Sequence, residues 1–111
     1  MALTRNFKDT VKARAERDPA FRRGLFQEAL EAFTSDDVET GKILLRDYVN
    51  ATVGFERLAK DLDKNPKSLM RMLSAEGNPR ANNLFALVAH LKASEGVTLS
   101  LRSREAPHAA R

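Results

Sequence analysis

Apolar residues recur every three to four positions along most of this chain, which is the spacing that one face of an α-helix requires. The pattern predicts six helices, at about residues 4–16, 19–34, 37–50, 55–62, 66–74 and 80–93. Residues Val97 to Leu101 instead alternate between apolar and polar, which is the period of a half-buried strand. Residues 103–111 show no period and are expected to form a disordered tail. We therefore expect an all-α domain with a short C-terminal β-strand.

Residues that favour helix starts support three of these boundaries. Asp18-Pro19 and Asn65-Pro66 each place an N-cap residue before a proline at the first helical position. Asp36, followed three residues later by Glu39, resembles a capping box that opens the third helix. These residues predict the starts of the second, third and fifth helices.

The apolar stripes of these helices predict the hydrophobic core. In the first three helices the predicted core residues are Phe7, Val11, Ala15, Phe21, Leu25, Ala29, Leu30, Phe33, Val38, Leu45, Tyr48 and Val49. In the later helices they are Phe55, Leu58, Ala59, Leu62, Leu69, Met70, Leu73, Leu84, Leu87, Val88 and Leu91. Phe26 falls beside the main stripe of its helix, so exposure to a partner is the alternative for this side chain.

The predicted strand needs a partner, because its backbone N–H and C=O groups must be hydrogen bonded. The chain offers no convincing second strand. We expect Val97, Leu99 and Leu101 to pair antiparallel with the same strand of a second copy across a two-fold axis, which makes a homodimer. A short extended segment near the N-terminus is the alternative partner.

The composition excludes several classes of protein. The chain has 111 residues, the length of one domain, and its lack of cysteine excludes disulfides, thiolate nucleophiles and Cys-based zinc sites. No apolar run approaches the ~20 residues that cross a bilayer. The N-terminus lacks the apolar region of a signal peptide. We therefore expect a protein of the cytoplasm that does not associate with membranes.

The net charge of +4 belongs to the second half of the chain. Residues 1–48 carry nine Lys or Arg and nine Asp or Glu, whereas residues 49–111 carry ten and six. Much of the excess lies in one stretch, at Arg57, Lys60, Lys64, Lys67, Arg71 and Arg80. This is the segment that we expect to meet a polyanion.

The same stretch has the pattern of a helix-turn-helix, because two short helices are separated by a turn of three or four residues. A small residue, Ala59, lies near the middle of the first helix, where two helices that cross steeply approach most closely. The predicted shared core beneath the crossing consists of Leu58, Ala59, Leu62, Leu69 and Leu73. The polar face of the second helix is then free to enter a major groove.

Residues 58–74, which read LAKDLDKNPKSLMRMLS, are followed by Gly77-Asn78-Pro79 and a helix that runs to Leu91. This segment resembles the helix-turn-helix of the phage-repressor-like (Xre/Cro, lambda-repressor-like) transcriptional regulators. More narrowly, it is similar to the addiction-module antidote proteins, the HigA-like antitoxins. The resemblance covers about residues 54–101. The family usually has glycine where this chain has Asp63 and an apolar residue where it has Lys64.

The resemblance implies a regulator that binds a double-stranded DNA operator, commonly as a dimer. It also implies an antitoxin that represses its own operon and neutralises an RNase-type toxin protein. We therefore expect a helix-turn-helix region with the C-terminal strand over residues 53–102. An N-terminal helical region over residues 1–52 is expected to pack on it.

Two roles follow for the polar residues of this stretch. Lys67, Ser68 and Arg71 project from one side of the second helix, and their donors suit base edges, with Arg71 able to bind guanine O6 and N7 together. The predicted phosphate-binding residues are Arg57, Lys60, Lys64, Asn65 and Arg80. The alternative for each residue is an ordinary solvated position.

Other functions find less support in the sequence. The chain has two histidines, His90 beside core leucines and His108 in the tail, and Asp36-Asp37 is better explained by helix capping. We expect no catalytic residues, no metal site and no cofactor. The alternative function is a protein-interaction module with little DNA binding, either toxin-neutralising or a scaffold.

Overall fold

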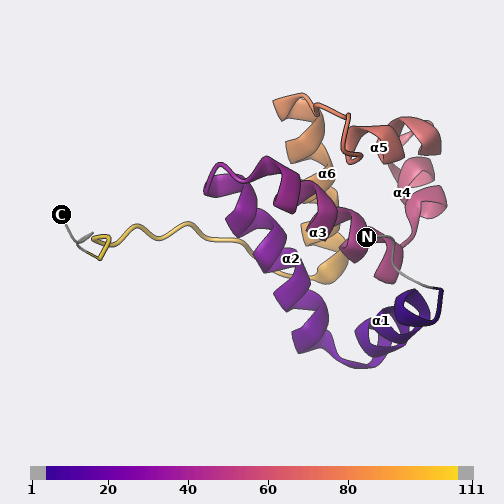
Figure 1. Cartoon of the computed structure of the whole chain (residues 1–111), viewed down its shortest axis with the longest axis horizontal. Coiled ribbons are helices and arrows are strands. Elements are labelled where there is room, and N and C mark those ends of the chain that lie inside the picture. Colours follow the sequence, from indigo (N-terminus) through magenta and orange to yellow (C-terminus); the bar gives the residue numbers. More distant parts are fainter. Residues whose placement is uncertain (1–4, 108–111) are drawn as a thin grey trace.

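The computed structural model describes residues 5–107, and six helices follow one another along them (Figure 1). These are α1 (Arg5–Arg17), α2 (Pro19–Thr34), α3 (Val38–Ala51), α4 (Phe55–Leu62), α5 (Pro66–Met72) and α6 (Ala81–Glu95). The predicted all-α fold is confirmed. Each predicted helix is present, with boundaries within two residues of those expected.

The helix starts show how local sequence fixes the boundaries. The Asp18 carboxylate accepts a hydrogen bond from the Phe21 amide at 3.1 Å, and the Asn65 side chain accepts one from the Lys67 amide at 2.8 Å. Both predicted caps are therefore confirmed.

The predicted cap of the third helix is wrong by one residue. Asp37, not Asp36, caps α3 by accepting a hydrogen bond from the Thr40 amide. Asp36 adopts a left-handed conformation with φ of 61°, and the Asp37 amide donates to the Ala32 carbonyl. This is how helices commonly end, so Asp36 terminates α2 and is not available to start α3.

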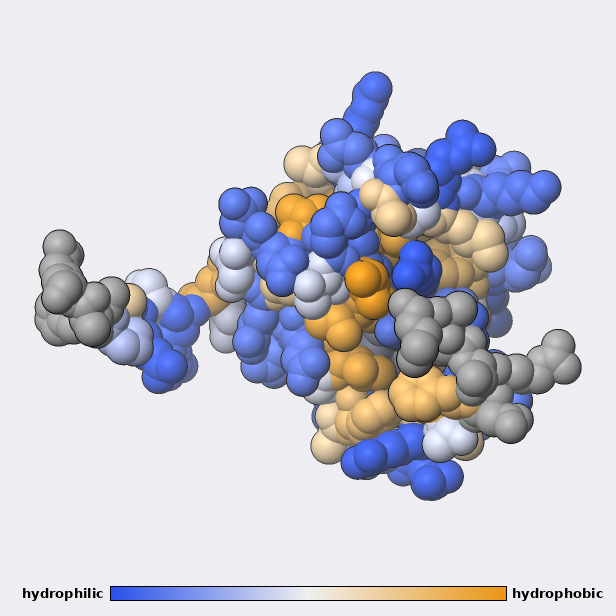
Figure 2. All heavy atoms as spheres, viewed as in Figure 1, coloured by the Kyte–Doolittle hydropathy of each residue, from blue (hydrophilic) through white to orange (hydrophobic). Residues whose placement is uncertain are grey.

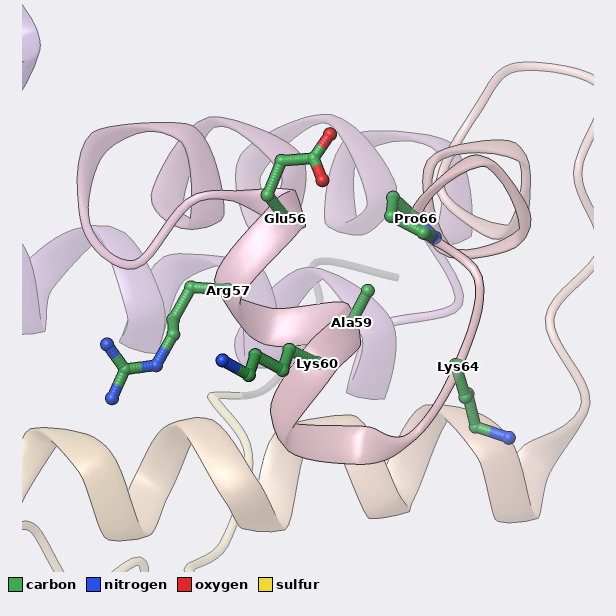
Figure 3. Close-up of a pocket in the computed structure, with 6 residues that line it drawn as sticks. All are labelled: Glu56, Arg57, Ala59, Lys60, Lys64 and Pro66. Carbon is green, nitrogen blue, oxygen red and sulfur yellow. The ribbon is translucent and has the colours of Figure 1, made fainter.

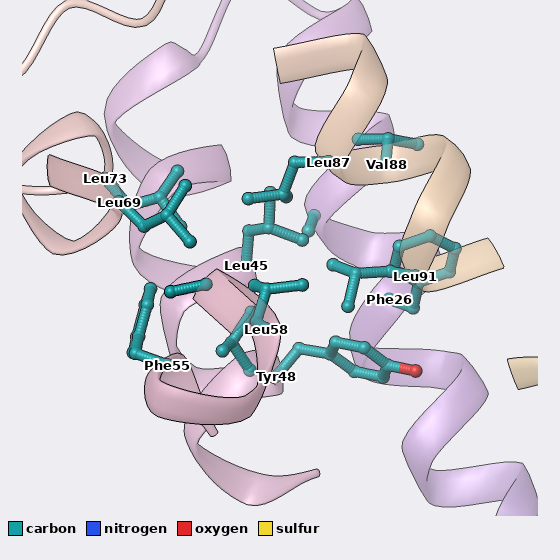
Figure 4. Packing of buried hydrophobic residues seen from close by; sticks show 13 residues of the cluster. Phe26, Leu45, Tyr48, Phe55, Leu58, Leu69, Leu73, Leu87, Val88 and Leu91 are labelled. Carbon is teal, nitrogen blue, oxygen red and sulfur yellow. The ribbon is translucent and has the colours of Figure 1, made fainter. Parts of the chain in front are cut away.

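One hydrophobic core joins the two halves of the chain (Figure 4). Helices α2 to α6 all contribute to it, and Figure 4 shows Leu45 of α3 at the centre of the labelled side chains. The buried residues are Phe26, Ala29, Leu45, Tyr48, Val49, Phe55, Leu58, Ala59, Leu69, Leu73, Leu87, Val88 and Leu91. The α4–α5 pair is therefore packed against the N-terminal helices.

Three core expectations, and the alternative considered for Phe26, differ from the structure. Phe26 is buried and its ring lies 5.1 Å from that of Tyr48, so its exposure to a partner is wrong. Phe7, Val38 and Met70 are 52%, 40% and 47% exposed, although they were expected in the core. Val38 is the first residue of α3. Leu69 and Leu73 occupy the buried side of α5, and Met70, the residue after Leu69, points away from that side.

A buried carboxylate ties the end of α6 to the N-terminal helices. The Glu95 side chain is almost fully buried, and it accepts hydrogen bonds from Arg22 Nε at 2.9 and 3.0 Å and from the Tyr48 hydroxyl. Arg23 forms a longer ion pair with it, at 3.6 Å. Arg22 also donates to the Ala15 carbonyl, so this cluster connects α1, α2, α3 and α6.

Beyond Gly96, residues 97–107 form neither helix nor strand and extend away from the helices (Figure 1). The prediction of a strand at Val97–Leu101 is therefore wrong for the single chain. A strand needs a neighbouring strand to bond its backbone groups. Residues 5–96 form helices and no strand, so the segment has no partner strand within the described chain. Residues 1–4 of the alternative N-terminal partner, and residues 108–111 of the predicted tail with His108, lie outside the described residues.

The Tyr48 hydroxyl gives a test of the buried cluster. Burial raises the pKa of this phenol, and its hydrogen bond to the Glu95 carboxylate raises the pKa further. The stabilisation is therefore fully present below pH ~10, where the phenol of the unfolded chain titrates, and it is lost as the pH rises towards the folded pKa. We expect the unfolding free energy of the wild type to fall above pH ~10 more steeply than that of Tyr48→Phe.

Denaturant unfolding at a series of alkaline pH values measures this difference. Tyr48 is the only tyrosine of the chain, so the ultraviolet absorbance of phenolate reports on it directly. Phenolate that forms at the ordinary pKa while the helical circular dichroism is intact would contradict the buried hydrogen bond.

Candidate nucleic-acid interface

A three-residue turn, Asp63 to Asn65, connects α4 to α5. Asp63 has φ of 55° and ψ of 49°, the left-handed conformation that usually favours glycine. Aspartate tolerates this region better than most residues, so the turn forms without glycine at this position. The Lys64 amide donates to the Ala59 carbonyl at 2.8 Å, which closes the end of α4. Lys64 itself is exposed and adds no contact to the core.

The core beneath the two short helices forms as predicted. Leu58, Ala59, Leu69 and Leu73 are buried, and Leu62 is half-buried against them. Figure 3 shows Ala59 on the side of α4 that faces Pro66 at the start of α5. A larger side chain at Ala59 would therefore push the two helices apart.

The outer side of α5 carries the three predicted base-reading residues. Lys67, Ser68 and Arg71 are all exposed, on the side opposite the buried Leu69 and Leu73. Ser68 and Arg71 follow Lys67 by one and four residues, which keeps all three within one sector of the helix surface. Hydrophilic side chains project from the surface over α4 and α5 (Figure 2).

Two shallow hollows flank this helix and meet at Lys64. The first, of about 450 Å³, lies between α4 and the start of α5 (Figure 3). It is lined by Glu56, Arg57, Ala59, Lys60, Lys64 and Pro66. The second, of about 460 Å³, lies between α5, the following loop and the start of α6, and brings together Lys64, Ser68, Arg71 and Arg80. Four of the five predicted phosphate-binding residues, Arg57, Lys60, Lys64 and Arg80, thus line the hollows at the two edges of the predicted reading face, whereas Asn65 lines neither.

Acidic residues limit this basic surface at its borders. Asp61 pairs with Arg57 at 3.3 Å and contacts His90 Nε2 at 3.2 Å. His90 therefore bridges α6 to α4. Glu56 lines the first hollow and Glu76 the second.

Sequence reasoning missed three residues of this surface. Met70 is an exposed apolar residue beside the polar side chains of α5, and the four-residue spacing of Leu69 and Leu73 could have excluded it from the core. Asn78 and Asn83 line the second hollow. Their amide groups can bind bases or phosphates, but nothing in the pattern of apolar residues places them there.

Other kinds of site find no support among the described residues. Over residues 7–107, no group of three His, Asp or Glu side chains is arranged to hold a metal ion. In the same part of the chain, no helix has the length and apolar character needed to cross a membrane.

No protein-family model, no curated protein and no solved structure matches this chain. The resemblance of residues 54–101 to Xre/Cro regulators, and the residue roles that it implies, stay predictions. Any function must therefore be argued from the surface described above.

The turn at Asp63 gives a test of this geometry. We expect Asp63→Gly to keep or raise the unfolding free energy, by up to about 1 kcal/mol, because glycine adopts the left-handed conformation without strain. Asp63→Val should cost about 1–2 kcal/mol, because a β-branched residue is disfavoured there. Urea unfolding of the three proteins provides the comparison. Equal losses in both variants would show that the residue does not hold this conformation.

Proposed function

We propose that this chain is a sequence-specific DNA-binding regulator of transcription, in which α4 and α5 form a helix-turn-helix and α5 enters the major groove. The observation that carries the proposal is the outer side of α5. It presents Lys67, Ser68 and Arg71 to solvent, while Leu69 and Leu73 anchor the opposite side in the core. Guanidinium, ammonium and hydroxyl donors at these positions suit the acceptors on base edges.

The flanking cations support contacts to phosphates on both sides of the groove. Arg57 and Lys60 lie beside one hollow, Arg80 beside the other, and Lys64 beside both. Asn65 uses its side-chain oxygen to cap α5, which leaves its amide NH₂ for a phosphate. Such contacts fix the register of the protein on DNA and make binding depend on salt.

The extended C-terminal segment supports a dimer as the binding unit. Leu99 is 42% and Leu101 96% exposed, on a backbone that has no partner strand among the described residues. Antiparallel pairing of Val97, Leu99 and Leu101 with a second copy would give the backbone of this segment a partner strand and would cover the exposed leucines. Two copies of α5 would then read the two half-sites of a palindromic operator.

The resemblance to HigA-like antitoxins supports a narrower proposal. The regulator would then repress its own operon and neutralise a toxin protein, with α1–α3 as the part outside the strongest resemblance. The neighbouring gene is a direct check, because an antitoxin gene should lie beside a small toxin-like reading frame.

A second candidate function is a protein-interaction module with little DNA binding. The outer side of α6 favours it, because Phe85 is largely exposed there and Asn82, Ala86 and Ala89 beside it are exposed and uncharged. Exposed aromatic residues are enriched at protein interfaces.

Arg71 and Lys64 should respond differently to truncation if α5 reads bases. After selection of a preferred sequence from random duplexes, Arg71→Ala should lose about 1–3 kcal/mol of binding free energy on it and relax the base preference at one position. Lys64→Ala should weaken all sequences about equally and lower the slope of binding against salt by about one. Fluorescence anisotropy with labelled duplexes at several salt concentrations measures both effects.

The matched control is Arg17→Ala, because Arg17 is an exposed arginine at the end of α1. This variant should bind as the wild type does. A uniform loss in Arg71→Ala would make Arg71 a phosphate contact. A wild type that does not bind any duplex at low salt would overturn the DNA-binding proposal and favour the interaction module.

The dimer is tested by placing charges on the extended segment. Leu99→Glu with Leu101→Glu should convert the dimer to a monomer, because like charges would face each other across the paired strands. Size-exclusion chromatography with light scattering over a range of concentrations measures the change, and circular dichroism should stay unaltered. A wild type that is monomeric throughout this range would contradict the dimer.

A further inference from the structure

The loop between α5 and α6 is held from inside by a buried lysine of α3. Lys42 is 2% exposed, and its Nζ donates to the carbonyls of Gly77 at 2.8 Å and Ala75 at 3.3 Å. The Glu39 carboxylate, one turn earlier in α3, pairs with the same nitrogen at 3.0 Å. An ammonium group has three donors, and here three oxygens surround it.

A second cation of α3 contacts the same loop at its start. Arg46 donates to the Leu73 carbonyl at 3.5 Å, immediately after the end of α5. Lys42 and Arg46 are four residues apart, so they project from the same side of α3. This side of α3 therefore binds backbone carbonyls both near the end of α5 and further along the loop.

The loop in turn lies directly against the backbone of Arg71. A Cβ atom at Gly77 would lie only 2.0 Å from the Arg71 carbonyl oxygen, so no other residue fits without a shift of the backbone. The Ser74 hydroxyl and amide both donate to the Arg71 carbonyl, at 2.7 and 3.1 Å, and the Gly77 amide donates to the Ser74 carbonyl. A chain of contacts thus leads from Lys42 through Gly77 and Ser74 to Arg71.

Stability alone does not explain a lysine at this position. Burial of an ammonium is costly, and an apolar residue of similar volume often stabilises a protein as well or better. Two directional hydrogen bonds from Nζ, however, fix the loop at the Ala75 and Gly77 carbonyls, which apolar packing does not do. The buried charge therefore serves the geometry of the loop and of the residue that the loop supports.

We propose that Lys42 is a positioning residue for DNA reading. Its ammonium group, oriented by Glu39, fixes the carbonyls of Ala75 and Gly77 and so sets the position of Arg71 relative to the major groove. The inference rests on the proposed DNA-binding function. Lys42 itself does not face the DNA, because its charge is buried behind the loop.

Lys42→Met tests the proposal, because methionine keeps the apolar stem and removes the ammonium. We expect the variant to remain helical and to bind a scrambled duplex with the affinity and salt dependence of the wild type. Its preference for the selected duplex over the scrambled one should fall by about tenfold, since Arg71 is displaced from its base. Lys12→Met, which changes an exposed lysine of α1, is the matched control and should keep the preference.

The outcomes separate this inference from the function on which it rests. A wild type without sequence preference overturns the proposed function. If the wild type prefers the selected duplex and a folded Lys42→Met variant keeps the same preference, the positioning role is overturned. An equal loss of affinity for both duplexes in the variant overturns it as well. If Lys42→Met does not fold, Glu39→Gln carries the test, because it leaves the lysine in place and removes the carboxylate charge that orients it. That variant should lose part of the preference, and full retention overturns the proposal.

Discussion

The packing of α4 and α5 against α3 is the constraint on which the rest of the structure depends. These helices have eight and seven residues, which is too short for a stable helix in water. Their conformation comes from the burial of Leu58, Leu69 and Leu73 against a core that has Leu45 of α3 at its centre. The polar surface of α5 is therefore ordered only because its other side is buried against the N-terminal helices.

Two charged groups complete this packing where the apolar core ends. Glu95 gathers Arg22, Arg23 and Tyr48 at one end of α3, and Lys42 binds the loop after α5 near the other. Both are almost completely buried and both contact oppositely charged or polar groups from other elements, as buried charges must. The N-terminal helices thus support the proposed DNA-binding surface by directional contacts as well as by apolar area.

The helices and the shared core of α4 and α5 could be predicted from the sequence, because the spacing of apolar residues and the helix-capping residues are local properties. The sequence was insufficient where an outcome depended on neighbours in space. Exposure was considered for Phe26, although 100° per residue places it between Phe33 and Leu30, and its ring is buried beside that of Tyr48. Met70 is exposed because α5 turns it away from the core. No feature of the sequence singles out Lys42 among the cations of the N-terminal half. Nothing in its local pattern shows that a loop 33 to 35 residues later covers it. The strand at Val97–Leu101 failed because alternation predicts a strand only where a partner exists.

The separation of the two sides of α5 has an evolutionary consequence. Lys67, Ser68 and Arg71 have solvent on one side and contribute no apolar contact to the core, so other side chains can replace them with little effect on folding. Gly77 and Lys42 have no such freedom. Gly77 lies against backbone, and Lys42 donates two hydrogen bonds to the loop and forms an ion pair with Glu39. Under the proposed function, related proteins that bind other target sequences should vary at the former three positions and keep the latter two.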